Sequence, residues 1–277
     1  MHTSAIRSMA TAILLLACLF LISCSDSGAP KEGTPAYFWA AAKETFVDAD
    51  YVKTVAHLEK LTASENEYTA RARPWLLVIS SGTTRGYMDL ADSFDAGAHA
   101  SKTNPTAFRR GTNAYRAEAN RAALEFVQVF DQFAKGEDDP VPVALPFPTG
   151  GAAPVSQLAR AAAGTMPAPG ELETAVKNAI KRGVLLSACA AAGAPDDPAK
   201  TQELLKPGTL QVPRAAFMMA LANTLFEQSK LYGPRQIGNP DRVKIFCTRA
   251  LDALKTVPET KQTKELSLKI TKSLKTT

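Results

Sequence analysis

One stretch near the middle of the chain spaces its apolar residues by four, three, four, three and four positions: Tyr115, Ala119, Ala122, Phe126, Val129 and Phe133. Residues three and four apart share one face of an α-helix, whereas a strand alternates its faces at every residue. Asn104-Pro105 precedes the stretch as a helix start, and Lys135-Gly136 follows it as a stop. The sequence therefore predicts one long amphipathic helix, whose apolar stripe must pack against other elements.

Most of the remaining sequence also predicts helices. We expect them at 35–47, 51–63, 74 to about 81, about 87 to 100, 170–192, 198–205, 213–231, 241–257 and 259–274. The run "PWLLVIS", residues 74–80, is apolar on all sides and is expected to be buried. Gly82 and Gly86 are expected to interrupt the helix after it. The predicted fold class is all-α, built from stacked helical hairpins.

Residues 137–170 differ in composition from both flanks, because prolines recur throughout and leave room for only one short helix, at 155–163. The segment "PVPVALPFP" predicts an extended strap. Its apolar residues Val143, Leu145 and Phe147 are expected to dock on the helices. The strap suggests two helical lobes, 36–136 and 171–277, the second closed by a capping helix.

Two segments resemble helical hairpins of the tetratricopeptide class: "YFWAAAKETFVDADYVKTVAHLEKL" and "AFMMALANTLFEQSKLYGPRQIGNPDRVKIFCTRALDALKTVP". Each has a helix, a turn and a second helix, with Tyr51, Ala250 and Pro258 near the family's expected positions. Thr54 departs from the usual alanine, the second segment has a long loop, and the units do not repeat every 34 residues. The resemblance implies a stack of helix pairs with a concave face that binds a protein or peptide.

The N-terminus predicts a cleaved export signal. Arg7 precedes an apolar run from Ala10 to Ile22, which is too short for the roughly 20 residues of a membrane span. Leu21-Ile22-Ser23-Cys24 resembles the bacterial lipobox, which implies cleavage between Ser23 and Cys24 and acylation of Cys24. Residues 1–23 would then be the signal peptide and 24–35 a flexible tether.

This resemblance implies a protein anchored to a lipid bilayer of the cell envelope, and Ser25 favours the outer membrane, facing the periplasm, over the inner membrane. An uncleaved anchor is the alternative, and Cys18 is a poorer acylation site because apolar residues continue beyond it. "GYMDLADSF" and "AFRRGTNAYRAEANRAALEFV", together with the lipidated start, resemble helical lipoprotein subunits of periplasmic solute transporters. That likeness implies an alternative function, an accessory subunit with an enclosed ligand pocket.

The sequence offers little catalytic chemistry. Only His57 and His99 follow the predicted signal, and a nucleophile usually needs a nearby histidine base. No zinc motif is present, and "SSGTTRG" lacks the phosphate-loop pattern. The formal net charge of +5 is spread along the chain, which does not indicate nucleic-acid binding. We therefore expect no enzyme activity, no metal and no cofactor.

Two further features keep alternatives open. Cys189 and Cys247 both lie on apolar helical faces, where they form either a disulfide or two buried free thiols. Several arginines are candidates for a groove that takes anionic groups, although a solvated helix surface is the favoured interpretation: Arg71, Arg73, Arg109, Arg110, Arg116 and Arg121. The lysines between Lys261 and Lys275 are expected either on the solvent-exposed face of the last helix or in contact with anionic lipid.

Overall fold

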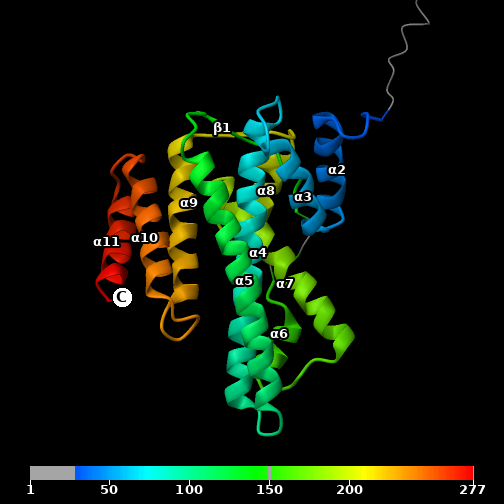
Figure 1. Cartoon of the computed structure of the whole chain (residues 1–277), viewed down its shortest axis with the longest axis vertical. Coiled ribbons are helices and arrows are strands. Elements are labelled where there is room, and N and C mark those ends of the chain that lie inside the picture. The colour runs from blue at the N-terminus through cyan, green and yellow to red at the C-terminus, as the bar shows by residue number, and fades with distance from the viewer. Residues whose placement is uncertain (1–28, 149–150, 152, 277) are drawn as a thin grey trace, which may run out of the picture.

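The computed structural model describes residues 29–148, 151 and 153–276. Its helices are α2 (Pro35–Val47), α3 (Tyr51–Thr62), α4 (Thr69–Ala100), α5 (Pro105–Phe133), α6 (Ser156–Ala162), α7 (Pro169–Ala191), α8 (Pro198–Leu205), α9 (Arg214–Ser229), α10 (Pro240–Lys255) and α11 (Lys261–Lys275). Two short strands, β1 (Val141–Val143) and β2 (Leu210–Val212), and a 3-10 turn, η1 (Lys230–Tyr232), complete the chain. The prediction of an all-α fold of stacked helices is confirmed (Figure 1). The predicted lipidation site, Cys24, and its cleavage partner Ser23 lie outside the described residues.

Local sequence explains where several helices begin. Proline occupies the first helical position of α2, α5, α8 and α10, where its missing N–H leaves no hydrogen bond unmade. The preceding residues are Thr34, Asn104, Asp197 and Asn239, and each side chain accepts a hydrogen bond from a backbone N–H in the first turn. These four starts depend on adjacent residues alone, which is why the sequence predicted them closely.

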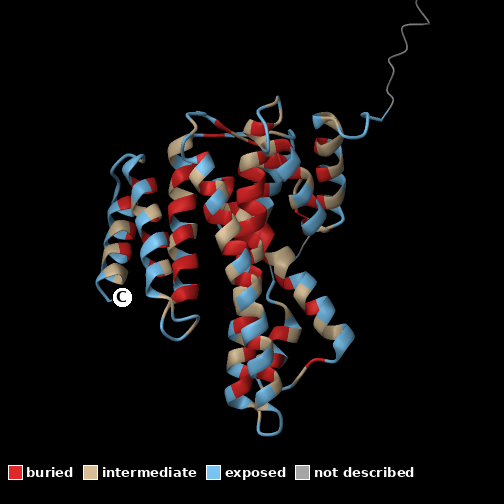
Figure 2. Cartoon of the chain, viewed as in Figure 1, coloured by how far each residue is buried: buried red, intermediate tan, exposed pale blue. Residues whose placement is uncertain are grey.

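Helix α4 is the central element, and it corrects one prediction. It runs without a break from Thr69 to Ala100, through Pro74, Gly82 and Gly86. Trp75, Leu76, Leu77, Val78 and Ile79 are each at most 3% exposed, so the expected burial of this run is confirmed. Figure 2 shows buried residues concentrated along this helix. Helices α3, α5, α6, α7 and α9 and strand β1 all contact it.

The two glycines of α4 do not end the helix because they form a contact with α7. A Cβ atom at Gly82 or Gly86 would lie less than 3.0 Å from backbone atoms of α7, and one at Gly183 would lie equally close to the backbone of α4. Real Cβ atoms essentially never approach this closely, so only glycine fits at these three positions. We call Gly82, Gly86 and Gly183 the glycine seam.

The predicted stripe lies on α5, and most of it is buried. Ala119, Ala122, Phe126 and Phe133 are at most 4% exposed, while Tyr115 and Val129 are half-buried. Neighbouring positions, Phe108, Ala123, Val127 and Phe130, are buried as well. The buried surface is wider than the stripe because α5 packs along α4 on one side and meets η1 and α10 on another.

The strap docks as expected, and a small sheet fixes it. Val141, Val143, Ala144 and Leu145 are buried, and Phe147 packs against the same core. Strand β1 pairs antiparallel with β2 in the register Val141↔Val212 and Val143↔Leu210. This ribbon lies across the end of the molecule where α5 ends (Figure 1). The sequence predicted the extended strap but not its partner strand.

The main buried cluster includes residues from both sides of the strap, from Trp39 to Ile270. Polar contacts also join the halves. Asp131 on α5 accepts two hydrogen bonds of 2.7 Å from Arg249 on α10. Arg116 on α5 donates a 2.8 Å hydrogen bond to Gln236 in the loop before α10, and Gln236 donates one to Asp92 on α4. The core therefore continues across the predicted lobe boundary.

Helix α11 closes the stack with one face packed and the other in water. Leu266 and Ile270 are buried, whereas Lys261, Lys264, Lys269 and Lys272 are exposed. Leu268 is 71% exposed and is an exception on the outer face. Among the described helices, none combines the length and apolar character that crossing a membrane requires.

We expect Arg249→Ala to reduce the free energy of unfolding by about 1 kcal/mol, because exposed ion pairs contribute little and this one is only partly buried. Urea unfolding of the variant measures the loss. The matched control is Lys255→Ala, because Lys255 is 75% exposed and its ion pair is with Asp252 on the same helix. Equal losses in both variants would contradict a role for Arg249 in joining the halves.

Candidate functional site

A groove of about 730 Å³ lies between α3, α4, α5 and α7. We call it the central groove. Its α4 side comprises Ile79, Ser80, Thr83 and Tyr87. Helix α3 contributes Tyr51, Val52, Val55, Ala56 and Glu59, α5 contributes Arg121, Ala122 and Glu125, and α7 contributes Lys177, Ile180 and Lys181. The groove is concave and partly open to solvent. Its volume lies within the roughly 300–1,000 Å³ typical of ligand pockets.

Charges of both signs line the central groove. Glu59 and Glu125 come from α3 and α5, and their negative charges are close enough to repel each other. Arg121 pairs with Glu118 at 2.9 Å, and Lys177 pairs with Glu173 at 2.8 Å. Lys181 is half-buried beside them. The groove can therefore bind positive and negative groups at different points along one ligand.

Glu125 is a carboxyl group of the groove whose pKa is raised by folding. Burial, followed by the negative charge of Glu59, raises the pKa of Glu125 above its ordinary value, and the nearby Arg121 partly offsets this. An acid whose pKa is raised by folding destabilises the fold when ionised, and the cost disappears as the pH falls through the raised pKa. The carboxylate is therefore an energetic cost to the unliganded protein at neutral pH.

We expect Glu125→Gln to unfold at a higher urea concentration than the unmodified protein at neutral pH. The difference should shrink as the pH falls toward the ordinary pKa of a glutamate, because Glu125 then becomes protonated. The control is Glu44→Gln, because Glu44 is exposed on α2 and away from the groove. A stability gain that is independent of pH, or equal in the control, would rule out this origin.

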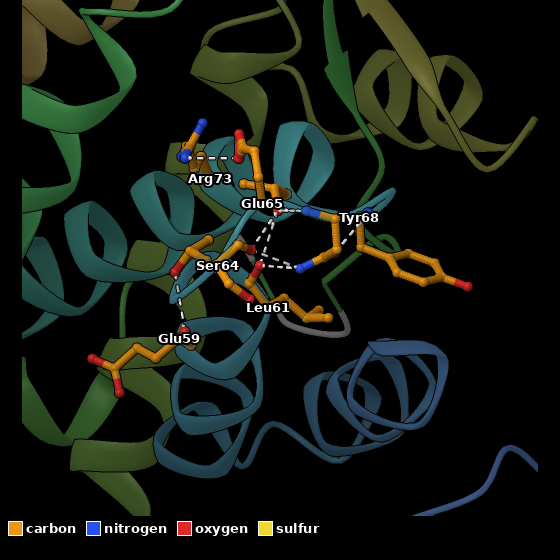
Figure 3. A network of polar contacts seen from close by, with 9 residues as sticks. Glu59, Leu61, Ser64, Glu65, Tyr68 and Arg73 are labelled. Atoms are coloured by element: carbon orange, nitrogen blue, oxygen red, sulfur yellow. Dashed lines mark hydrogen bonds and ion pairs between the residues drawn. The ribbon is translucent and has the colours of Figure 1, made fainter. Parts of the chain in front are cut away.

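A network at the turn between α3 and α4 fixes the α3 side of the groove (Figure 3). The backbone oxygen of Leu61 accepts hydrogen bonds from Asn66 Nδ2, at 2.8 Å, and from Thr69 Oγ1, at 3.0 Å. Both side chains also donate to the backbone oxygen of Ser64. The end of α3 is therefore tied to the start of α4, just beyond Glu59.

One buried hydroxyl of the groove lining has no hydrogen-bond partner among the described residues. Tyr51 is 7% exposed, and burial raises its pKa to about 12. Its ring packs edge-on against Phe46, with centroids 5.4 Å apart. The α3 side of the groove therefore carries a buried hydroxyl whose ionisation is disfavoured by burial.

The six arginines predicted as one anion-binding set do not come together. Arg71 and Arg73 lie at the start of α4, whereas Arg109 and Arg110 lie at the start of α5. Consecutive helices of this length, joined by a short turn, place those starts roughly 40 Å apart at 1.5 Å per residue. Arg116 faces the loop before α10, and Arg121 lines the central groove. The structure therefore does not bring the six arginines into one groove, because they occupy opposite ends and different faces of the α4–α5 hairpin.

The structure also places the cysteines and histidines. Cys189 on α7 and Cys247 on α10 are free, buried thiols, so of the two alternatives the structure has the unbridged one. His57 lies against Phe38, with ring centroids 6.2 Å apart. His99 is exposed, with Nδ1 2.8 Å from the backbone oxygen of Asp95. Within the described ranges, no three His, Cys, Asp or Glu side chains gather where they could hold a metal ion.

Sequence reasoning did not identify Glu59 or Glu125 as site residues. Each is a single charged residue on an amphipathic helix, and such residues usually face water. Their proximity arises only when α3 and α5 are both packed against α4. The sequence marks Tyr51 only as the aromatic residue after a helical turn, and nothing in the sequence indicates that its hydroxyl is buried.

Comparison with known proteins identifies no relative. No protein-family model, curated protein or solved structure matches the chain. What the protein binds is therefore inferred from the geometry of its own side chains.

Proposed function

We propose that the protein is a lipoprotein, tethered to a membrane of the cell envelope through Cys24, that binds a protein segment or peptide in the central groove. The observation that carries this proposal is the groove itself, which combines apolar residues with charged residues of both signs on three helices. A binding scaffold needs such a surface and no catalytic groups. The outer membrane, facing the periplasm, is the proposed location.

The lining of the groove suits a peptide. Four helices contribute to it, and it presents both apolar and charged side chains to a segment that carries several side chains of its own. A peptide offers apolar side chains for Val55, Ile79 and Ile180 and charged groups for the carboxylates and lysines beside them. The exposed Val52, at the rim, extends the apolar surface outward.

The groove can be tested by photo-crosslinking in cells. A photoreactive residue in place of Val52, 78% exposed in the groove lining, is expected to capture a discrete protein or peptide. The same residue in place of Ile245, 43% exposed on α10, is expected not to.

A matched pair of variants gives the control. Ala56→Trp fills the groove and should abolish the crosslink, whereas Ala40→Trp, at an exposed position of α2 outside the groove, should leave it intact. A crosslink that survives Ala56→Trp, or that forms equally from position 245, would refute binding in the groove.

The tether has its own test. When cells are labelled with a fatty acid, the unmodified chain is expected to carry label and Cys24→Ala to lose it completely, because the lipobox resemblance gives no other acceptor thiol in the mature chain's first residues. Cys18→Ala is the control and should keep the label. If Cys24→Ala still carries the label, the proposed lipid attachment through Cys24 is refuted, whereas the proposed binding in the central groove is unaffected.

A further inference from the structure

A second cavity, of about 660 Å³, lies at the end of the molecule that carries the strap. We call it the strap cavity. Its walls come from α2, the first turn of α4, the strap segment 144–147 and the segment 202–209, which covers the end of α8 and the turn into β2. It shares no lining residue with the central groove.

The β1–β2 ribbon explains why a cavity forms there. Because the strands are antiparallel and Val143 pairs with Leu210, the strap leaves the ribbon at the same end where the 206–209 turn enters it. The two segments then diverge, one docking through Leu145 and the other turning at Gly208 with a φ of +87°. Trp39 and Lys43 of α2, together with Arg71, line the space between them.

The charge lining this cavity is mainly positive. Lys43, Arg71 and Lys206 face one carboxylate, Glu203. The only ion pair among them joins Lys206 to Glu203 at 4.0 Å, with side chains 78% and 75% exposed. Such an exposed pair contributes little. Lys43 and Arg71 have no carboxylate partner among the described residues.

Arg71 is held in place without having its charge neutralised. Its guanidinium lies 5.6 Å from the ring centroid of Trp39 and 5.4 Å from that of Tyr68, which stack on each other. It donates one hydrogen bond, of 3.3 Å, to the backbone oxygen of Glu67. A guanidinium has five N–H donors in a planar fork that matches a carboxylate or a phosphate. The remaining donors are thus available to a ligand.

Apart from Gln202, Gly208 and Thr209, the remaining lining residues are apolar. Trp39, Ala144, Leu145 and Leu205 are buried, and Pro146 and Phe147 are half-buried. An ion alone would leave this surface uncovered, and an apolar molecule would leave the cations without a partner. From this combination we infer that the strap cavity binds an organic anion, a carboxylate or phosphate joined to an apolar body. This site requires neither the central groove nor the lipid tether.

Calorimetric titration of the purified full chain tests the inference with defined probes. 4-Phenylbutyrate and phenyl phosphate carry the two anionic groups on an apolar ring, 4-phenylbutylamine reverses the charge, and acetate lacks the ring. At least one of the two ring-bearing anions is expected to bind, more weakly as salt is added, and more tightly than the amine or acetate. Which of the two binds distinguishes a carboxylate ligand from a phosphate ligand.

Variants then locate the site. Arg71→Met removes the charge but keeps a stem of similar size, and should weaken binding about tenfold. Lys43→Met, at an exposed position where folding is not at risk, should weaken it about threefold. Lys60→Met, exposed on α3 outside the cavity, should bind like the unmodified chain.

Four outcomes would overturn the inference. The first is that neither 4-phenylbutyrate nor phenyl phosphate binds at millimolar concentration. The second and third are that 4-phenylbutylamine or acetate binds as tightly as the ring-bearing anions. The fourth is that Arg71→Met and Lys43→Met both bind the anion as tightly as the unmodified chain.

Discussion

Gly183→Ala is expected to destabilise the protein by about 3 kcal/mol, which is the upper end of the usual cost of overpacking. The added methyl group would lie less than 3.0 Å from the backbone of α4 at Gly82 and Gly86. Backbone atoms cannot turn aside as a flexible side chain can, so the two central helices would have to separate. A fall in Tm of roughly 6 to 12 °C corresponds to this loss in a chain of this size.

The matched control is Gly170→Ala, in the first turn of the same helix. Apart from its chain neighbours and the nearby backbone of its own helix, no heavy atom lies within 4 Å of a Cβ at Gly170, and its φ is not positive. Alanine there should leave stability unchanged or raise it by up to about 1 kcal/mol, because it restricts the unfolded chain. Similar losses from both substitutions would show that helical glycine in general, and not the glycine seam, accounts for the effect.

Trp75→Ala is expected to reduce the free energy of unfolding by about 3 to 5 kcal/mol, the range for removing a large buried aromatic side chain. Trp75 is 0% exposed and packs edge-on against both Trp39 and Phe46, at centroid distances of 5.3 and 5.2 Å. Its removal leaves a cavity between α2 and α4. Because the chain has two tryptophans, the fluorescence of Trp39 still reports unfolding in this variant.

Trp75→Phe separates ring packing from hydrogen bonding. The indole Nε1 of Trp75 is buried with no partner among the described residues, so its loss removes no hydrogen bond. A phenylalanine keeps most of the contact with Trp39 and Phe46. Trp75→Phe should therefore lose less than half of the free energy of unfolding that Trp75→Ala loses. Equal losses in the two variants would mean that the aromatic contacts contribute little.

The sequence predicted the features that depend on neighbouring residues. The starts of α5 and α10 follow from Asn104-Pro105 and Asn239-Pro240, because the cap and the proline act within one turn. The apolar stripe on α5 could likewise be predicted from the spacing of its residues alone, because residues three and four positions apart share one face of a helix. Docking of the strap followed from its apolar side chains, which a free linker would have left in water.

The errors concern contacts between distant segments. Gly82 and Gly86 cost helix stability locally, about 1 kcal/mol each, and the compensating contact comes from α7, where Gly183 is about a hundred residues away. Strands β1 and β2 have three residues each, too few for a periodic signal. The two concave sites depend on charged residues that look like ordinary surface positions until α2, α3, α5 and α7 are packed around α4.

The glycine seam has a consequence for how fast a ligand can be captured. Helices α4 and α7, which line the central groove on two sides, meet through their backbones and cannot slide past each other without a clash. The spacing between those two sides is then the same before and after a partner arrives. We therefore expect association to follow a single exponential in stopped-flow measurements, with a rate that rises linearly with partner concentration and shows no plateau from a slow opening step.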